Sequence, residues 1–278
     1  LANTAWAFAK ADYLDDQLFA QLARAVQALL ESQGDTAFNS QEITNTAWAF
    51  ATASHRDDAL FYRLARAAES RLEDFNSQGL SNTAWAFAKV GHLDAQLCRE
   101  MAKAVVNTRG RLEEFNAQDL ANIAWAYAKL GQHDAALFAA LAKAVHGHFL
   151  DNFNAQGLAN VAWAFAKAGH IDAKLFASLG RAIEGRLDDC NAQDVSNTAF
   201  AFAKACHLDE SLFAALARRV VASASASADD DDDDDDDGRR RLEDFNVQDL
   251  VNTTWAFAKL GQYDTSLFTA VGASIKAR

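Results

Sequence analysis

The chain has 278 residues, half of them hydrophobic, and contains no proline. This length and apolar content allow a large buried core, and the absence of proline favours long, uninterrupted helices over strand- and loop-rich folds. The formal net charge is −12, but nine of the negative charges belong to the run Asp229–Asp237. The rest of the chain is therefore close to neutral, so net charge alone neither requires nor excludes a nucleic-acid partner.

Several other classes are disfavoured at this level. The three cysteines, Cys98, Cys190 and Cys206, have no disulfide-like or metal-type spacing. No apolar stretch approaches the ~20 residues that cross a membrane. No phosphate-binding loop, dinucleotide fingerprint or zinc-protease motif is present, and the recurring histidines (His55, His92, His170 and His207) lie a whole repeat apart. We therefore expect no metal, no cofactor and no enzymatic activity within these residues, and we interpret the histidines as turn residues.

In chain order, one motif recurs seven times, beginning as "NTAWAFAK" at Asn3 and ending as "NTTWAFAKLG" at Asn252. Its aromatic residues are Trp6, Trp48, Trp85, Trp125, Trp163, Phe200 and Trp255. Their successive spacings are 42, 37, 40, 38, 37 and 55 residues. A period near 38 predicts an all-α protein, an α-solenoid of about seven two-helix repeats.

Each repeat is predicted to contain a helix A, which carries the motif, and a helix B. Helix A begins after a capping asparagine: Asn39, Asn76, Asn116, Asn154, Asn191 or Asn246. It ends in four repeats at a glycine suited to left-handed backbone: Gly91, Gly131, Gly169 or Gly261. Helix B begins after a capping aspartate: Asp15, Asp57, Asp94, Asp134, Asp172, Asp209 or Asp264.

The long interval before the last motif predicts three segments. Residues 1–221 hold repeats one to six, the first of them truncated. Residues 222–240, a Ser/Ala and poly-Asp insertion, are expected to be disordered because they have nothing apolar to bury. Residues 241–278 form a seventh repeat, after which we expect the array to continue or to have been cut. Since the chain starts at Leu1 within a repeat, we expect a fragment whose targeting peptide is not visible.

At about 100° per residue, helix A separates into distinct faces. In the repeat from Asn116, we expect Leu120, Ile123, Tyr127 and Leu130 to pack on helix B, with alanines on the flanks where neighbouring repeats approach. Gln118, Asn122, Trp125 and Lys129 fall on the opposite side. Stacked repeats then align these four positions into rows, a cationic groove with amides and aromatics that suits single-stranded RNA.

The candidate RNA-binding residues come from these four rows. They are Lys10, Lys89, Lys129, Lys167, Lys204 and Lys259; Asn45, Asn82, Asn122, Asn160 and Asn197; Gln78, Gln118, Gln156 and Gln193; and Trp85, Trp125 and Trp163.

Each row also has an explanation that needs no ligand. The asparagines could bond the backbone of a neighbouring repeat, the tryptophans could pack between repeats, and the lysines could be an ordinary solvated face. A second basic row on helix B (Arg24, Arg66, Lys103, Lys143, Arg181 and Arg218) is expected to serve solubility.

The rows hardly vary between copies, whereas a base-by-base code needs positions that differ. One site does vary. It directly precedes the asparagine of each motif and holds Ala2, Thr44, Ser81, Ala121, Ala159, Ser196 and Val251. We therefore predict backbone-dominated binding with modest base discrimination.

The units "FNAQDLANIAWAYAKLG" and "FNAQGLANVAWAFAKAG" resemble octotricopeptide repeats and, more loosely, the helical repeats of FAST-kinase-like and RAP-domain proteins. The resemblance covers almost the whole chain outside the insertion. It implies an RNA-binding protein of mitochondria or chloroplasts that acts in RNA processing, stability, editing or translation. The proline-rich repeat start of that family and a C-terminal RAP domain are missing here.

From the sequence we expect a monomeric, organellar RNA-binding solenoid that binds single-stranded RNA and no membrane, with other proteins as further partners. The alternative is a protein-interaction scaffold of the HEAT or armadillo type without nucleic-acid binding. A third possibility is the targeting half of a nuclease whose catalytic domain lies outside these residues.

Overall fold

The computed structural model describes residues 1–107, 111–147, 150–225 and 244–278. Within these ranges the chain forms fourteen α-helices and short 3-10 turns, and no strand. The predicted all-α fold is confirmed. The helices group into two compact units, Leu1–Val145 and His146–Arg278.

In the first unit, the A helices are α1 (Ala2–Lys10), α3 (Ser40–Thr52), α5 (Ser77–Val90) and α7 (Ala117–Lys129). The B helices are α2 (Asp16–Gln33), α4 (Asp58–Glu69), α6 (Ala95–Asn107) and α8 (Ala135–Gly147), the last of which ends just beyond the unit. The 3-10 turns η1 (Gly34–Thr36), η2 (Leu72–Asp74) and η3 (Arg111–Glu114) connect successive repeats.

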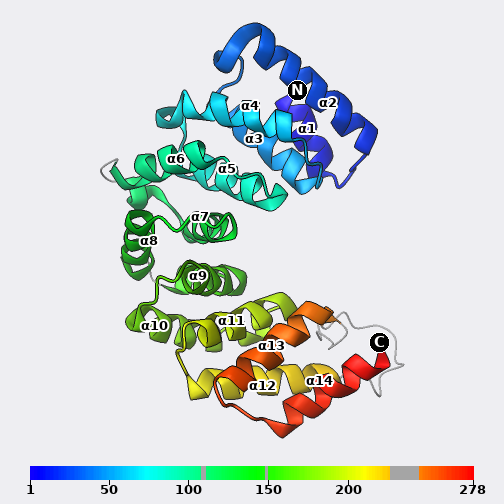
Figure 1. The fold of residues 1–278 in the computed structure, drawn as a ribbon, viewed down its shortest axis with the longest axis vertical. Coiled ribbons are helices and arrows are strands. Elements are labelled where there is room, and N and C mark those ends of the chain that lie inside the picture. Colours follow the sequence, from blue (N-terminus) through cyan, green and yellow to red (C-terminus); the bar gives the residue numbers. More distant parts are fainter. Residues whose placement is uncertain (108–110, 148–149, 226–243) are drawn as a thin grey trace. The chain divides into compact units, whose positions relative to one another are not determined.

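In the second unit, the A helices are α9 (Ala155–Ala168), α11 (Ala192–Lys204) and α13 (Val247–Lys259). The B helices are α10 (Ala173–Glu184), α12 (Glu210–Ser225) and α14 (Thr265–Ala277), with η4 (Leu150–Asn152) and η5 (Leu187–Asp189) as turns. Each unit is an α-solenoid in which A helices stack on A helices and B helices on B helices (Figure 1).

Small residues set the geometry of the A layer. Ala124, Ala126 and Ala128 of α7 are all buried, as are their counterparts in the neighbouring A helices. Because alanine side chains let helix backbones approach closely, the A helices of both units pack much more tightly than the B helices do. This difference places the A layer on the inner side of the curve within each unit.

The predicted helix starts and stops are confirmed. Each of the six capping asparagines accepts a hydrogen bond from a backbone N–H three residues on, and each of the seven capping aspartates does the same at 2.7–3.1 Å. The four glycines have φ between 69° and 78°. In the other three repeats Asp12, Ser54 and Cys206 adopt the same left-handed backbone at φ 52–55° without being glycine.

In several repeats a phenylalanine pair links the B helix to the next A helix, and a histidine ring lies against the pair. Phe61 of α4 packs on Phe87 of α5 with ring centroids 5.0 Å apart, and His92 lies 5.8–5.9 Å from both rings. His55 and His207 repeat this arrangement. As predicted, the histidines follow helix A in the turn, and their half-buried rings complete the apolar core there.

The insertion falls mostly outside the described residues, which omit 226–243. At its start the structure differs from the expectation of disorder, because α12 continues through Ser225. Alanine is the strongest helix former, so the Ala/Ser segment can prolong the helix of the sixth repeat. Ser223 also donates a hydrogen bond to the carbonyl of Arg219, one turn earlier.

Candidate nucleic-acid interface

One face of helix A gathers the residues predicted for RNA binding. In α7, Gln118, Asn122, Trp125 and Lys129 succeed one another at three- and four-residue steps, which places them along a single stripe. Tyr127, Leu120 and Ile123 on the other side are buried, as expected. We call the solvent-facing stripes of α1, α3, α5 and α7 in the first unit, and of α9, α11 and α13 in the second, the A-layer face.

The lysines of the A-layer face are exposed and their charges are not neutralised. Lys10, Lys89, Lys129, Lys167, Lys204 and Lys259 each lie in the last turn of an A helix. No carboxylate of the described residues lies within ion-pair distance of any of the six. Their position is favourable for the helix itself, since a helix C-terminus carries partial negative charge. The charge nevertheless remains available to an anion.

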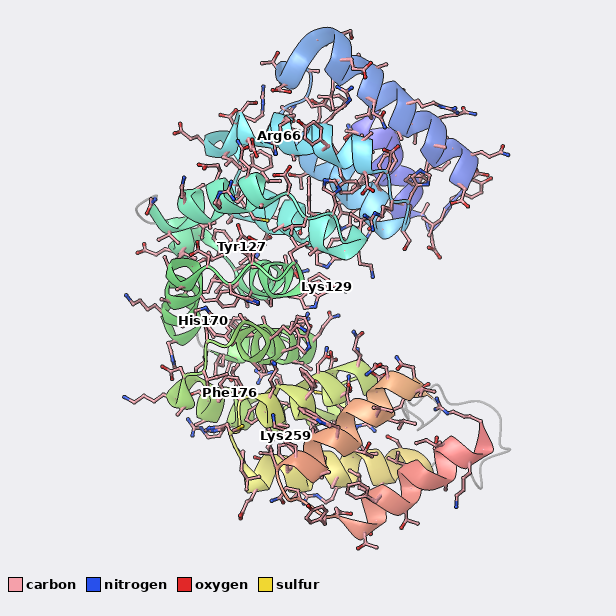
Figure 2. All side chains as sticks on the ribbon, in the orientation of Figure 1. Arg66, Tyr127, Lys129, His170, Phe176 and Lys259 are labelled. Atoms are coloured by element: carbon pink, nitrogen blue, oxygen red, sulfur yellow. The ribbon has the colours of Figure 1, made fainter. Side chains whose placement is uncertain are left out.

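Two of these lysines also lie against the aromatic row. The Lys129 ammonium is 5.1 Å from the Trp125 ring centroid, and that of Lys259 is 4.8 Å from the Trp255 ring centroid. Both distances are within the range of cation–π attraction. Figure 2 shows Lys129 on an A helix, well apart from Arg66, which belongs to a B helix of the same unit.

The amide rows have almost no partners within the protein. The glutamines are exposed and the asparagines of α3, α5, α7, α9, α11 and α13 are half-buried. Within the described part of the chain, the only hydrogen bond made by these side chains joins Gln248 to Asn252, at 2.8 Å. The asparagines therefore do not bond the backbone of a neighbouring repeat, which removes the ligand-free explanation considered for this row.

The tryptophans combine packing with exposure. Trp48, Trp85, Trp125 and Trp163 are half-buried, and Trp6 and Trp255 are 41% and 42% exposed. Phe200 and Trp255, on neighbouring helices α11 and α13, have ring centroids 5.4 Å apart and planes inclined by 32°. The row thus forms part of the contact between repeats while keeping ring surface open to solvent.

The variable position beside the stripe is not on the A-layer face. Ala2, Thr44, Ser81, Ala121, Ala159 and Ser196 are buried between stacked A helices, and only Val251 of α13 is exposed. The Thr44 hydroxyl lies 3.2 Å from that of Thr83, and the Ser81 hydroxyl donates to Asp119 Oδ1 at 2.8 Å. Variation at this position therefore tunes the contact between repeats.

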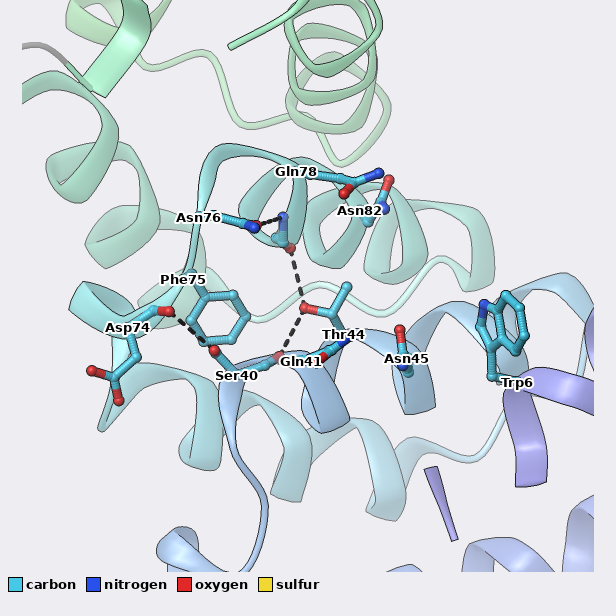
Figure 3. Close-up of a pocket in the computed structure, with 11 residues that line it drawn as sticks. Trp6, Ser40, Gln41, Thr44, Asn45, Asp74, Phe75, Asn76, Gln78 and Asn82 are labelled. Carbon is cyan, nitrogen blue, oxygen red and sulfur yellow. Dashed lines mark hydrogen bonds between the residues drawn. The ribbon is translucent and has the colours of Figure 1, made fainter. Parts of the chain in front are cut away.

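A cavity of about 460 Å³ opens on the A-layer face between α3 and α5 (Figure 3). Five amide side chains line it, Gln41 and Asn45 from α3, Gln78 and Asn82 from α5 and the capping Asn76, together with Trp6 from α1. A similar cavity of about 420 Å³ lies between α11 and α13, but Asp244 and Asp249 line it. The sequence rows did not reveal these cavities.

The basic row of helix B differs from the lysines of the A-layer face, because some of its side chains form ion pairs with carboxylates. The Arg66 guanidinium lies in ion pairs with Glu69 and Asp94, and Lys103 pairs with Glu100 at 2.8 Å. Burial raises the pKa of Glu69. Burial also acts to raise the pKa of Asp94, but the Leu97 N–H and Arg66 outweigh it and lower that pKa overall.

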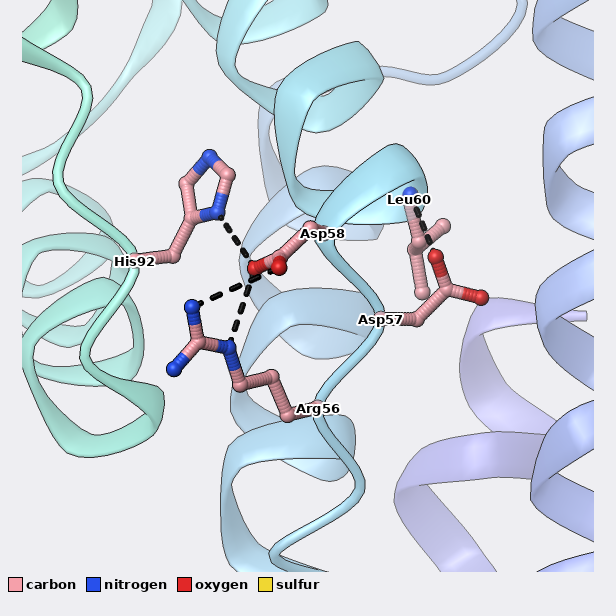
Figure 4. A network of polar contacts seen from close by, with 5 residues as sticks. All are labelled: Arg56, Asp57, Asp58, Leu60 and His92. Atoms are coloured by element: carbon pink, nitrogen blue, oxygen red, sulfur yellow. Dashed lines mark hydrogen bonds and ion pairs between the residues drawn. The ribbon is translucent and has the colours of Figure 1, made fainter.

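Charges near the start of helix B are also balanced locally. The Asp58 carboxylate accepts hydrogen bonds from Arg56, at 3.0 Å, and lies 3.1 Å from His92 Nδ1 (Figure 4). The Arg56 and His92 hydrogen bonds lower the pKa of Asp58. Its neighbour Asp57 caps α4 through the Leu60 N–H. The unpaired lysines of the A-layer face contrast with these partnered groups.

Two further properties follow from the described residues. They contain no cluster of three or more histidine, cysteine or acidic side chains arranged to hold a metal ion. None of the helices in these ranges combines the length and the apolar character needed to cross a membrane.

Residues 1–231 match the family described as RNA-editing substrate-binding complex 6 protein, which covers most of the chain. No curated protein matches the chain.

Proposed function

The chain belongs to the family of RNA-editing substrate-binding complex 6 proteins, and from this we propose that it is an RNA-binding component of an RNA-editing complex. The single observation that carries the proposal is the A-layer face, where exposed, unpaired lysines adjoin amides and aromatic rings that have open surface. The face would bind single-stranded RNA.

Each group on the A-layer face has a role in this proposal. The lysines contact phosphates, which supplies most of the affinity and makes it depend on salt. The tryptophans offer surface for base stacking, which tolerates any base. The amides donate to and accept from base edges or ribose hydroxyls. Because stacked helices lie about 8–10 Å apart, neighbouring repeats would contact successive parts of one extended strand.

The localisation, the mode of action and the partners of the protein are part of the same proposal. We favour the mitochondrion over the chloroplast, for which the family match offers no support. The chain would act by binding and presenting RNA, without catalysis by its own residues, and other proteins of the editing complex would be further partners. The match leaves the octotricopeptide resemblance as a hypothesis about repeat ancestry.

The test uses two triple variants with the same change in charge. Lys89, Lys129 and Lys167 on the A-layer face are changed together to Glu. In the control, Lys103, Lys143 and Arg181, exposed on helix B, are changed together to Glu. Affinity for a single-stranded RNA is measured by fluorescence anisotropy from 50 to 300 mM salt, and folding by circular dichroism.

We expect the A-layer variant to lose at least 100-fold in affinity and the helix B variant to lose much less. Equal losses would show that any basic surface suffices and would refute the A-layer face as the binding site. Unchanged RNA affinity in the A-layer variant would do the same. Wild-type protein that fails to bind RNA, while retaining protein partners, would favour the scaffold alternative.

A further inference from the structure

The lining of the cavity between α3 and α5 includes a glycine at a position that is acidic in most A helices. Four of the six described helix A starts carry an acidic third residue: Glu42, Asp119, Asp194 and Asp249. In α5 and α9 this residue is a glycine, Gly79 and Gly157. Asp119 shows what the acidic side chain does, because it is buried and bonds Ser81 of the preceding repeat.

Gly79 has no side chain at the corresponding place, which is closely surrounded by other atoms. A Cβ atom there would lie 3.4 Å from the Thr44 hydroxyl of the preceding repeat and 3.1 Å from Oδ1 of Asn76. The Thr44 hydroxyl donates to the Ser40 carbonyl and, at 3.4 Å, to the Gly79 carbonyl (Figure 3), and it lies 3.2 Å from the Thr83 hydroxyl. The missing side chain therefore leaves this cavity without the carboxylate that Asp249 adds to the cavity between α11 and α13.

The lining identifies the kind of group that would enter. Gln41, Asn45, Gln78 and Asn82 make no hydrogen bond within the described protein, so both donors and acceptors are available on both sides of the cavity. A phosphate fits poorly, because no lysine or arginine lines the cavity. The edge of a nucleobase, with donors and acceptors side by side, matches the amides.

We propose that the cavity between α3 and α5 is a nucleobase subsite, in which one base of the bound strand turns inward between Gln41/Asn45 and Gln78/Asn82. This inference rests on the proposed function. The volume, about 460 Å³, lies within the range of small-ligand sites. Because a side-chain amide exchanges donor and acceptor by rotating half a turn, the subsite accepts different bases. The exposed Trp6 ring at its edge offers a stacking surface.

The test adds a neutral side chain to the lining of the cavity. Gly79→Asn places at this position a side chain of the size that Asp119 has in α7, beside the same type of capping asparagine. The matched control, Asp119→Asn, leaves an already occupied position occupied. Affinities of the full chain are measured for an oligouridylate and for an abasic oligomer with the same number of phosphates, and thermal unfolding verifies that both variants fold.

We expect Gly79→Asn to weaken oligouridylate binding about 10-fold and to leave abasic binding unchanged, while Asp119→Asn changes neither. Loss of both affinities to the same extent, or of neither, would overturn the subsite while leaving RNA binding intact. If wild-type protein binds neither oligomer, the proposed function itself fails, and the two failures are thereby distinguished.

Discussion

The phenol of Tyr127 donates a hydrogen bond to the backbone carbonyl of Cys98 at 2.6 Å, inside the core between α7 and α6. In other repeats both positions are phenylalanine, as in the pairs Phe61–Phe87 and Phe176–Phe202. The smaller cysteine leaves room for the tyrosine hydroxyl, which fills that space and finds an acceptor. Two residues 29 positions apart thus both differ from their counterparts in other repeats, and together they keep this interface filled.

Tyr127→Phe removes this buried bond, and we expect a loss of about 1 kcal/mol in the free energy of unfolding. Cys98→Phe alone overfills the site and costs about 1–3 kcal/mol. The double variant restores the pair used elsewhere and is expected to be more stable than Cys98→Phe alone. Urea denaturation of the four proteins measures the coupling. Strictly additive effects would contradict the compensation.

The same burial predicts thiol reactivity. Burial raises the pKa of Cys98 to about 12, so at pH 8 it is almost entirely the unreactive thiol. Cys190 is fully buried, whereas Cys206 is exposed. We expect one fast-reacting thiol per chain with Ellman's reagent and loss of that phase in Cys206→Ser. Two or three fast thiols in the folded protein would contradict this packing.

The left-handed turns after helix A predict opposite effects of glycine. Ser54→Gly relieves a non-glycine residue at φ 52° and should raise stability by up to about 1 kcal/mol. Gly131→Ala, at φ 69° with no atom near the added Cβ, should lower it by about 1 kcal/mol through backbone strain alone. Thermal unfolding measures both. Stability changes of the same sign in the two variants would show that backbone strain does not determine the stability of these turns.

The ion pair of Asp94 with Arg66 predicts a dependence of stability on pH. The pKa of Asp94 is lowered in the folded protein, so its contribution is complete above the unfolded value, near 4, and is lost as the pH falls through the folded value. Asp94→Asn still caps α6 but loses the charge. We expect it to cost about 1–2 kcal/mol at pH 7 and much less at pH 2–3.

Asp134→Asn is the matched control, because Asp134 caps α8 in the same way and has no ion pair within the described residues. Denaturant unfolding at several pH values distinguishes the two variants. A loss of stability in Asp94→Asn that does not depend on pH would show that the helix cap, and not the ion pair, is its cause.

Lys129→Gln tests the salt dependence of RNA binding. If Lys129 contacts one phosphate, the slope of log affinity against log salt should fall by about 0.7, the value for one contact to a single strand. Lys143→Gln on helix B should leave the slope unchanged. Equal slopes for wild type and Lys129→Gln would remove this lysine from the binding face.

Much of the fold could be predicted because its determinants are local and repeated. The capping asparagines and aspartates, the glycines that end helix A and the buried side containing Leu120, Ile123 and Tyr127 are all specified within one repeat. The placement of the four rows on one solvent-facing side of helix A follows from the helical period in the same way. Whether these rows bind RNA stays a prediction.

Contacts between repeats are known only from the tertiary structure. They join residues about one repeat apart, and they depend on the size of single side chains. The sequence alone left open whether Asn82 bonds the neighbouring backbone, and the stacking shows that its amide has no such partner. It did not reveal that Tyr127 compensates for Cys98, or that Gly79 and Thr44 line a cavity. The sequence determined which residues share a helix face, since that requires only the 3.6-residue period. Only the tertiary structure decided which helix faces meet and which polar groups are left without a hydrogen-bond partner. Both depend on how closely the side chains of neighbouring repeats can approach one another.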